Sequence, residues 1–143
     1  MNFMPYQFQE GAITLPDTWQ DQSMNVFVLP GDTGINLVIN RAPVPHGMTD
    51  DEYYQEVFHQ FRHNLKNYHE ISSDMVQLDE KPAHLLEYQW KSPEGMMYQC
   101  TLLQIRHNLL LTFTYTAQSP FSKKQREALL DIVYSFKATK QGG

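Results

Sequence analysis

Three side chains that can bind metals lie close together in the sequence. Glu56, His59 and His63 occur at positions i, i+3 and i+7, a spacing that places them on one face of a helix. The zinc protease motif requires a glutamate directly after its first histidine, and this chain has Gln60 there. A solvated polar helix face accounts for these residues, so the sequence predicts no metal site.

The other reactive residues lack the neighbours that catalysis needs. Cys100 lies within a predicted strand, without the helix N-terminus or cationic neighbour that activates a thiol, so a buried apolar role is expected. Asp50, Asp51 and Glu52 stand where a helix is predicted to begin, and carboxylates there favour the positive end of the helix dipole. No glycine-rich phosphate loop opens a helix. The sequence therefore predicts no catalytic residue and no cofactor, and an enzyme is the weaker class.

Size and charge restrict the remaining classes. The 143 residues fit one domain, residues 1–137, followed by a polar tail, residues 138–143, that we expect to be flexible. A net charge of −5 argues against nucleic acid as a partner, and no basic cluster suits anionic lipid. The N-terminus lacks a signal-peptide pattern, and no apolar run approaches membrane-spanning length. A cytoplasmic protein without membrane anchoring is expected.

The hydrophobic pattern predicts an α+β fold with a largely antiparallel sheet and two main helices. Thr49 and Glu52 form a capping-box pattern, so a helix is expected from there to about Lys66, and a second helix follows Ser122 as far as Phe136. Strands are predicted at residues 6–9, 12–15, 23–29, 35–41, 71–78, 83–92, 96–106 and 109–117.

Uncharged side chains gather on one predicted face of the sheet. Strand alternation gives a face with Met24, Val26 and Val28, and comparable faces in later strands with Met97, Gln99, Thr101, Leu103, Leu110, Thr112 and Thr114. Such a surface can contact an apolar partner while its hydroxyl and amide groups satisfy an occasional polar atom. The alternative is that this face is the ordinary core beneath the helices.

Two motifs connect the sequence with a family. They are Leu-Pro-Asp-x-Trp-Gln-Asp-Gln-Ser at residues 15–23 and Leu-Leu-Glu-Tyr-Gln-Trp at residues 85–90. With these motifs the chain resembles the Eag family of type VI secretion chaperones, the effector-associated group within the DcrB-like superfamily, from about Tyr6 to Phe136. The resemblance implies a Mog1/PsbP-like α+β sandwich that forms a homodimer.

The resemblance also implies a function. Such a chaperone shields the hydrophobic N-terminal transmembrane segments of a PAAR-containing, often Rhs-type, effector in the cytoplasm until the effector is loaded on the VgrG spike. A segment made for a bilayer exposes about 20 apolar residues and would aggregate in water. The chaperone would release it without ATP, because the sequence has no nucleotide-binding loop.

The resemblance places six residues in the partner-binding groove, namely Met24, Val26, Val57, Leu65, Met97 and Thr101. Family members carry a glutamine near the positions of Val57 and Thr101, and here Gln60, Gln99 or Thr101 would supply the polar contact. A register shift of one residue near Lys91–Gly95 would turn Met97 and Thr101 to the opposite face. Trp19 is expected to anchor the fold.

Two other classes of function fit parts of this pattern. A small-ligand or lipid-binding module, or a DcrB-like envelope protein, could use the same apolar sheet face, although the N-terminal sequence disfavours the envelope. A hydrolase or metalloenzyme at His59 and His63 would require bound metal.

Overall fold

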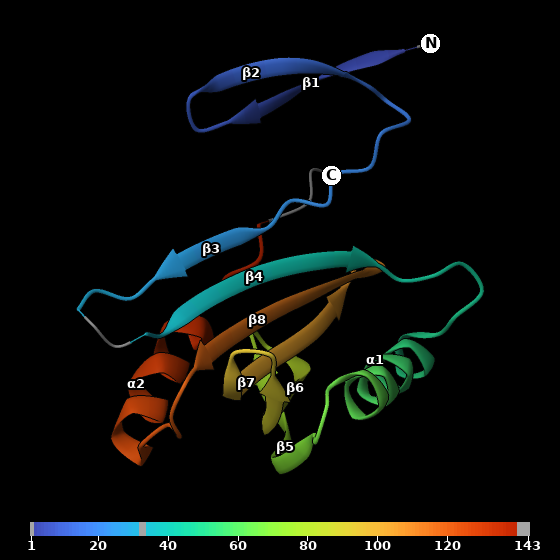
Figure 1. Cartoon of the computed structure of the whole chain (residues 1–143). Coiled ribbons are helices and arrows are strands. Elements are labelled where there is room, and N and C mark those ends of the chain that lie inside the picture. Colours follow the sequence, from blue (N-terminus) through green and yellow to red (C-terminus); the bar gives the residue numbers. More distant parts are fainter. Residues whose placement is uncertain (1, 32–33, 140–143) are drawn as a thin grey trace.

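The computed structural model of the chain describes residues 2–31 and 34–139 (Figure 1). Its elements are β1 Phe3–Phe8, β2 Gly11–Pro16, β3 Asn25–Val28, β4 Asn36–Pro43, α1 Asp50–Asn64, β5 His69–Leu78, β6 Lys81–Ser92, β7 Gly95–Arg106, β8 Leu109–Ala117 and α2 Lys123–Tyr134. Strands β3-β4-β8-β7-β6-β5 form one antiparallel sheet in that order, and β1 and β2 form a separate hairpin. The predicted α+β fold with two main helices is confirmed.

Two tight turns set the register of the meander from β5 to β8. Asp79 and Glu80 join β5 to β6, and His107 and Asn108 join β7 to β8, all with φ between 48° and 67°. Two consecutive residues with positive φ are typical of the type I′ turn, whose twist matches that of antiparallel strands. The register that results places β6 and β7 at the centre of the meander, with both of their faces available for packing.

Helix α2 covers one face of the sheet. Its buried residues Leu129, Leu130 and Val133 pack in a cluster with strand residues that alternate along β4, β6, β7 and β8, namely Leu37, Leu85, Leu102, Phe113 and Tyr115. An ion pair of 2.7 Å between Arg126 Nε and Glu87 Oε1 joins the helix to β6 at the margin of this cluster. This layer is the larger of the two hydrophobic cores.

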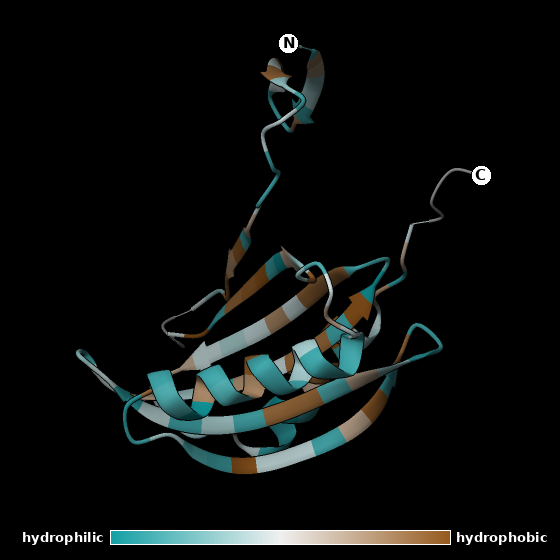
Figure 2. Cartoon of the chain, turned by 90° about the vertical axis from the view of Figure 1, so that its right-hand side faces the viewer, coloured by the Kyte–Doolittle hydropathy of each residue, from teal (hydrophilic) through white to brown (hydrophobic). Residues whose placement is uncertain are grey.

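Helix α1 covers part of the opposite face (Figure 2). Tyr54, Val57 and Phe58 pack against strand residues of the other parity, which are Leu86, Tyr88, Leu103 and Leu110. The helix begins with the predicted capping box, because the Thr49 side chain accepts from the Glu52 N–H and the Glu52 side chain accepts from the Thr49 N–H. Leu65 caps its C-terminus. The outer surface of α1 is mostly hydrophilic (Figure 2).

The hairpin of β1 and β2 projects away from the six-stranded sheet in both views (Figures 1 and 2). None of its residues belongs to either hydrophobic cluster of the described chain. Trp19, in the linker between β2 and β3, is 65% exposed. The expectation that Trp19 anchors the fold is therefore wrong for the single chain, because no core residue surrounds this side chain.

The ends of some elements differ from the prediction. Strand β3 covers only Asn25–Val28 within the predicted 23–29, and α2 ends at Tyr134, two residues before the predicted Phe136. In the predicted tail, the Ala138 N–H donates to Asp79 Oδ2 at 2.9 Å, so the first tail residue is held on the body of the fold. Residues 140–143 of the predicted tail lie outside the described residues.

Candidate partner-binding groove

Helix α1 leaves part of its sheet face uncovered, and a groove of about 440 Å³ lies there. Val57, Phe61 and Leu65 of α1 form one wall. The floor comes from β4, β6, β7 and β8, with Val38, Asn40, Ala42, Tyr88, Trp90, Gln99, Leu103, Leu110, Thr112, Thr114 and Thr116, and Arg41 completes the lining. Arg41 is the single charged group among these described residues. A groove with this lining suits an apolar partner that carries a few polar atoms.

The polar side chains of the floor are bonded to one another across the strands. Trp90 Nε1 donates to Gln99 Oε1 at 2.8 Å, and Gln99 Nε2 donates to Thr116 Oγ1 at 2.9 Å. The hydroxyl of Tyr88 is neutral at physiological pH, and burial raises its pKa further, to about 12. The floor therefore presents dipoles without a net charge.

Thr101 lies beneath this floor and not on its surface. Thr101 is 0% exposed, and its hydroxyl is hydrogen-bonded to the Tyr88 hydroxyl at 3.2 Å and to the Thr114 hydroxyl at 3.3 Å. The register that pairs Thr101 with Thr114 and Gln99 with Thr116 puts all four on the α1 side of the sheet. Thr101 therefore supports the floor from below in this conformation.

Four of the other predicted residues share that side of the molecule. Val57 and Leu65 line the groove, although Val57 is only 9% exposed. Met97 pairs with Trp90 and so faces the same side, farther along β7 and outside the lining. Val26 pairs with Val38 of the floor, is 57% exposed, and lies on the edge strand β3. Met24 precedes Val26 by two residues and is also exposed.

An unsatisfied polar atom lies beside the groove. Asn36 Oδ1 of β4 is buried and has no hydrogen-bond partner among the described residues. Asn36 pairs with Thr116 of β8 on one side and with Val28 of the edge strand β3 on the other. It therefore lies on the same face of the sheet as the groove floor. A buried acceptor without a donor costs about 1–3 kcal/mol. A partner that brings a donor to this position would recover that free energy.

The aromatic and β4 residues of the groove were not predicted from the sequence. Phe61, Val38, Asn40 and Trp90 were not among the expected partner-binding residues, yet all four line the groove. The sequence signal for Trp90 and Val38 was their alternation in strands, which predicts a face but does not show that α1 stops short of covering it.

The histidines of α1 and Cys100 lie outside the groove. The ring centroids of His59 and His63 are 4.0 Å apart on the exposed side of α1, and within residues 2–31 and 34–139 no group of three potential ligands could hold a metal. Cys100 is buried in the α2 layer, where burial raises the pKa of its thiol to about 11. In the same described ranges, neither helix has the length and apolarity of a membrane span.

Known proteins share this fold. The crystal structure of PA94 from Pseudomonas aeruginosa, a protein of unknown function, has a TM-score of 0.82 at 21% identity and covers 99% of this chain and 100% of its own. The solution structure of cyanobacterial PsbP (CyanoP) from Synechocystis sp. PCC 6803 has a TM-score of 0.51 at 12% identity, covering 93% and 89%. The predicted PsbP-like sandwich is thereby confirmed.

Sequence comparison gives the family. The protein named Effector EagT6, from Pseudomonas aeruginosa, is 25% identical over 111 residues, which are 75% of this chain and 77% of that protein. The family model described as DcrB matches residues 10–135, a segment that contains every element from β2 to α2. The chain therefore belongs to the DcrB family and is a distant homologue of Effector EagT6.

Proposed function

We propose that this protein is an ATP-independent chaperone that shields an N-terminal transmembrane helix of a PAAR/Rhs-type type VI secretion effector in the cytoplasm. It acts as a homodimer and aids loading of the effector on the VgrG spike. The observation that carries the proposal is the groove beside α1, with its apolar wall and its uncharged, internally hydrogen-bonded floor. The homology to Effector EagT6 supports an effector as the partner.

The groove matches the needs of a transmembrane helix in water. Exposure of the apolar side chains of such a helix to water costs free energy. This cost is removed when those side chains contact Phe61 and Leu65 beside the groove and Val26 on β3. Its occasional serine, threonine or asparagine side chains find acceptors and donors on the floor. Arg41 is the one charged lining residue, and its guanidinium donates to Ser23 O at 2.6 Å and to Asn25 Oδ1 at 3.0 Å. The charge of Arg41 is therefore held by Asn25, which lies on the opposite side of β3 from Val26.

The main test uses co-expression of a candidate effector's N-terminal region. With the wild-type protein, we expect the client to accumulate in the soluble fraction and to copurify, because its apolar helix is covered. Without the protein, we expect aggregation or loss. A client that is equally soluble and abundant in both cases would overturn the proposed function.

A pair of variants locates the contact. Val26→Asp adds a charge on the groove side of β3, whereas Gln55→Asp adds the same charge on the exposed side of α1, outside the groove lining. We expect Val26→Asp to reduce client copurification at least tenfold and Gln55→Asp to leave it near wild type, with circular dichroism unchanged in both. Charge at Met24 should act as Val26→Asp does. Undiminished binding by Val26→Asp removes β3 from the site.

Native mass spectrometry separates this proposal from a small-ligand or lipid-binding module. The groove volume of about 440 Å³ lies in the range of small-molecule pockets. A protein that retains a lipid or metabolite and ignores helical peptides is such a module. A dimer that takes up a helical peptide is a chaperone.

A further inference from the structure

The groove continues past the C-terminal end of α1 into a second pocket. This end pocket has a volume of about 410 Å³ and is lined by Asn64, Lys66, Trp90, Lys91, Ser92 and Pro93. Trp90 also lines the groove, so the two hollows meet at its side chain. The Lys91 N–H donates to Lys66 O at 2.8 Å, which holds the chain that follows α1 against β6. The end pocket is therefore fixed at one end of the groove.

Two lysines give the end pocket its charge. Lys66 and Lys91 are exposed, and neither takes part in an ion pair within the part of the chain that the structure describes. The Ser92 hydroxyl is already used, because it donates to Gly95 O at 2.8 Å and accepts from the Glu94 N–H at 3.1 Å. An ammonium group has three donors and no acceptor. The end pocket therefore suits a negatively polarised group with free oxygen atoms.

The start of α1 carries the opposite charge. Its first turn holds three carboxylates, those of Asp50, Asp51 and Glu52. The macrodipole of a helix is equivalent to only about half a unit charge at each end, so three carboxylates make the start of α1 negative. Arg62 in the last turn, together with Lys66 and Lys91, makes the other end positive. Side-chain charges thus produce a field along the groove that opposes the dipole of α1 itself.

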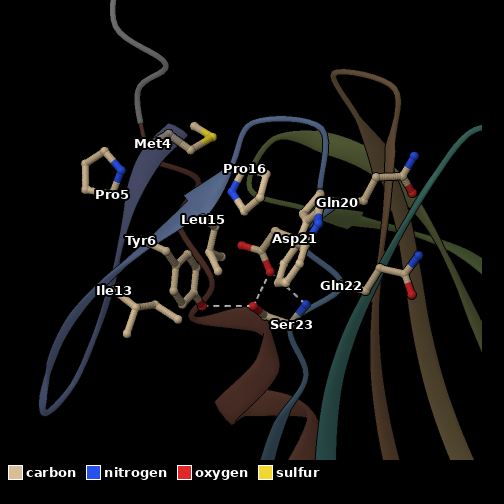
Figure 3. A pocket seen from close by; sticks show the side chains of 11 residues that line it. Met4, Pro5, Tyr6, Ile13, Leu15, Pro16, Gln20, Asp21, Gln22 and Ser23 are labelled. Atoms are coloured by element: carbon tan, nitrogen blue, oxygen red, sulfur yellow. Dashed lines mark hydrogen bonds between the residues drawn. The ribbon is translucent and has the colours of Figure 1, made fainter. Parts of the chain in front are cut away.

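Arg41 is the one charge in the groove lining, and its side chain is directed to the linker before β3. Its guanidinium donates to Ser23 O and to Asn25 Oδ1. In the same linker, Asp21 Oδ1 accepts from the hydroxyl and the N–H of Ser23 (Figure 3). The Asp21 carboxylate is ionised at physiological pH, and these hydrogen bonds lower its pKa further, with a smaller contribution from Arg41. Part of the charge of Arg41 is thereby offset, so the two ends of α1 dominate the field.

A transmembrane helix is longer than α1. The 15 residues of α1 span about 22 Å at about 1.5 Å per residue, whereas a helix of about 20 residues that crosses a bilayer spans about 30 Å. A client that lies along α1 therefore extends about 8 Å beyond it. The end pocket is continuous with the groove at the C-terminal end of α1, so it can take this extra length.

The two ends of a client helix differ in what they offer to a lysine. The last four carbonyl groups have no partner within the helix, and they carry the negative end of its dipole. Lysine side chains can hydrogen-bond such carbonyls. The first turn instead presents unpaired N–H donors and a positive dipole end, for which a lysine has no acceptor. Lys66 and Lys91 therefore favour the C-terminal end of a client.

We infer that the client helix lies parallel to α1, with its C-terminal end in the end pocket beside Lys66 and Lys91 and its N-terminal end toward Asp50 and Asp51. The inference rests on the proposed function, because it names the direction in which the proposed client binds. The dipole of α1 alone would favour an antiparallel client, because its positive start repels the positive start of the client. The full charges of the side chains reverse that preference.

The basic end has the stronger influence on the client. Lys66 directly follows Leu65, which lines the groove. Asp51 precedes the lining residue Val57 by about 9 Å along α1, which is comparable with the Debye length of about 8 Å at physiological ionic strength. The charge of Asp51 is therefore screened more than that of Lys66, so the lysines are the residues to test.

Photo-crosslinking of the full chain to a synthetic peptide measures the direction. The probe has about 20 residues of leucine, alanine and serine, uncharged flanks, and p-benzoylphenylalanine as its last residue. We expect its crosslinks to residues 64–66 and 91–93 to exceed those to residues 48–51 about fivefold. A second probe with the photoreactive residue at its start should give the opposite distribution. Crosslinks from the last residue that favour 48–51, or that are equal at both ends, overturn the inference.

A pair of double variants tests the lysines. Lys66→Glu with Lys91→Glu makes the end pocket negative, and we expect the crosslinks from the last residue of the probe to move to residues 48–51. Lys123→Glu with Lys124→Glu is the matched control, because it makes the same charge change at exposed positions of α2, on the other layer. The control should keep the wild-type distribution. An unchanged distribution in the first variant, with an intact far-ultraviolet spectrum, overturns the inference.

Capture of the client separates the two proposals. A wild-type protein that captures neither the probe nor an effector segment overturns the proposed function, and the inference with it. Capture in the antiparallel direction supports the chaperone and overturns only the inference.

Discussion

Gln99 has its amide orientation set by its neighbours. The Trp90 indole nitrogen can only donate, so Oε1 of Gln99 must face it, and Nε2 must then face Thr116. An amide oxygen accepts two hydrogen bonds and an NH₂ group donates two, so one of each remains for a client. Gln99 can therefore provide the polar contact that the family resemblance required, with its side chain already ordered before binding.

His84 contributes a pH dependence to the layer beneath α1. Its ring lies 4.4 Å from the ring of Tyr54 and 5.2 Å from that of Phe58. Burial lowers the pKa of His84 below its ordinary value of 6.5, and the nearby Asp51 partly opposes that shift. The unfolded chain therefore binds the proton more readily than the folded chain does.

The stability that His84 contributes is consequently present above pH 6.5 and is lost as the pH falls through the lowered folded pKa. We expect the urea midpoint of the wild type to fall between pH 7 and pH 5, and the same fall to be shallower in His84→Leu. His46→Leu, at an exposed loop position, should retain the wild-type slope. Parallel slopes for wild type and His84→Leu would falsify this assignment.

At the scale of elements, the two helices begin with comparable caps on opposite layers. Thr49 and Glu52 bond reciprocally at the start of α1, whereas Ser122 accepts from the Gln125 N–H at the start of α2. Removing an N-cap hydroxyl costs about 1 kcal/mol. Only α1, however, forms a wall of the groove.

Thr49→Ala and Ser122→Ala form a matched pair, because both remove an N-cap hydroxyl but only the first lies on the helix that forms a wall of the groove. We expect each to lower the free energy of unfolding by about 1 kcal/mol in urea titrations. Thr49→Ala should also weaken the binding of a helical client peptide, because the groove wall loosens, whereas Ser122→Ala should not. Equal effects of both variants on peptide affinity would show that α1 is no more coupled to the groove than α2.

Most of the helices and strands could be predicted from the sequence, but the way they pack against one another could not. Capping residues at Thr49 and strand alternation through β5 to β8 are local signals, and both were interpreted correctly. The burial of Thr101 and the exposure of Trp19 depend on how far α1 extends over the sheet and on whether the hairpin packs on it. Those are long-range properties, and no periodicity within a single segment encodes them.

Over the whole molecule, the two faces of the sheet differ in how completely they are covered. The α2 face is closed by Leu129, Leu130 and Val133 over a continuous cluster. The α1 face is closed only in part, because Tyr54, Val57 and Phe58 pack on it and a groove bordered by β4 remains open beside the helix. A ligand that binds the folded state stabilises it by RT ln(1 + [L]/Kd), about 2.7 kcal/mol at 100 times Kd. A client in the groove contacts the α1 layer, so it should suppress local opening more in that layer than in the α2 layer.

Hydrogen exchange measures this inequality. With a transmembrane peptide at about 100 times its Kd, we expect amides of α1, β3 and β4 to exchange more slowly, because the client covers the groove and suppresses local opening. Amides of α2 that exchange by local fraying should keep their rates, since that layer contacts no client. Protection of α2 alone would place the client on the wrong face. The comparison uses amides that exchange by local opening, because coverage by the client acts on them directly. Amides that exchange only by global unfolding report the stability of the whole fold.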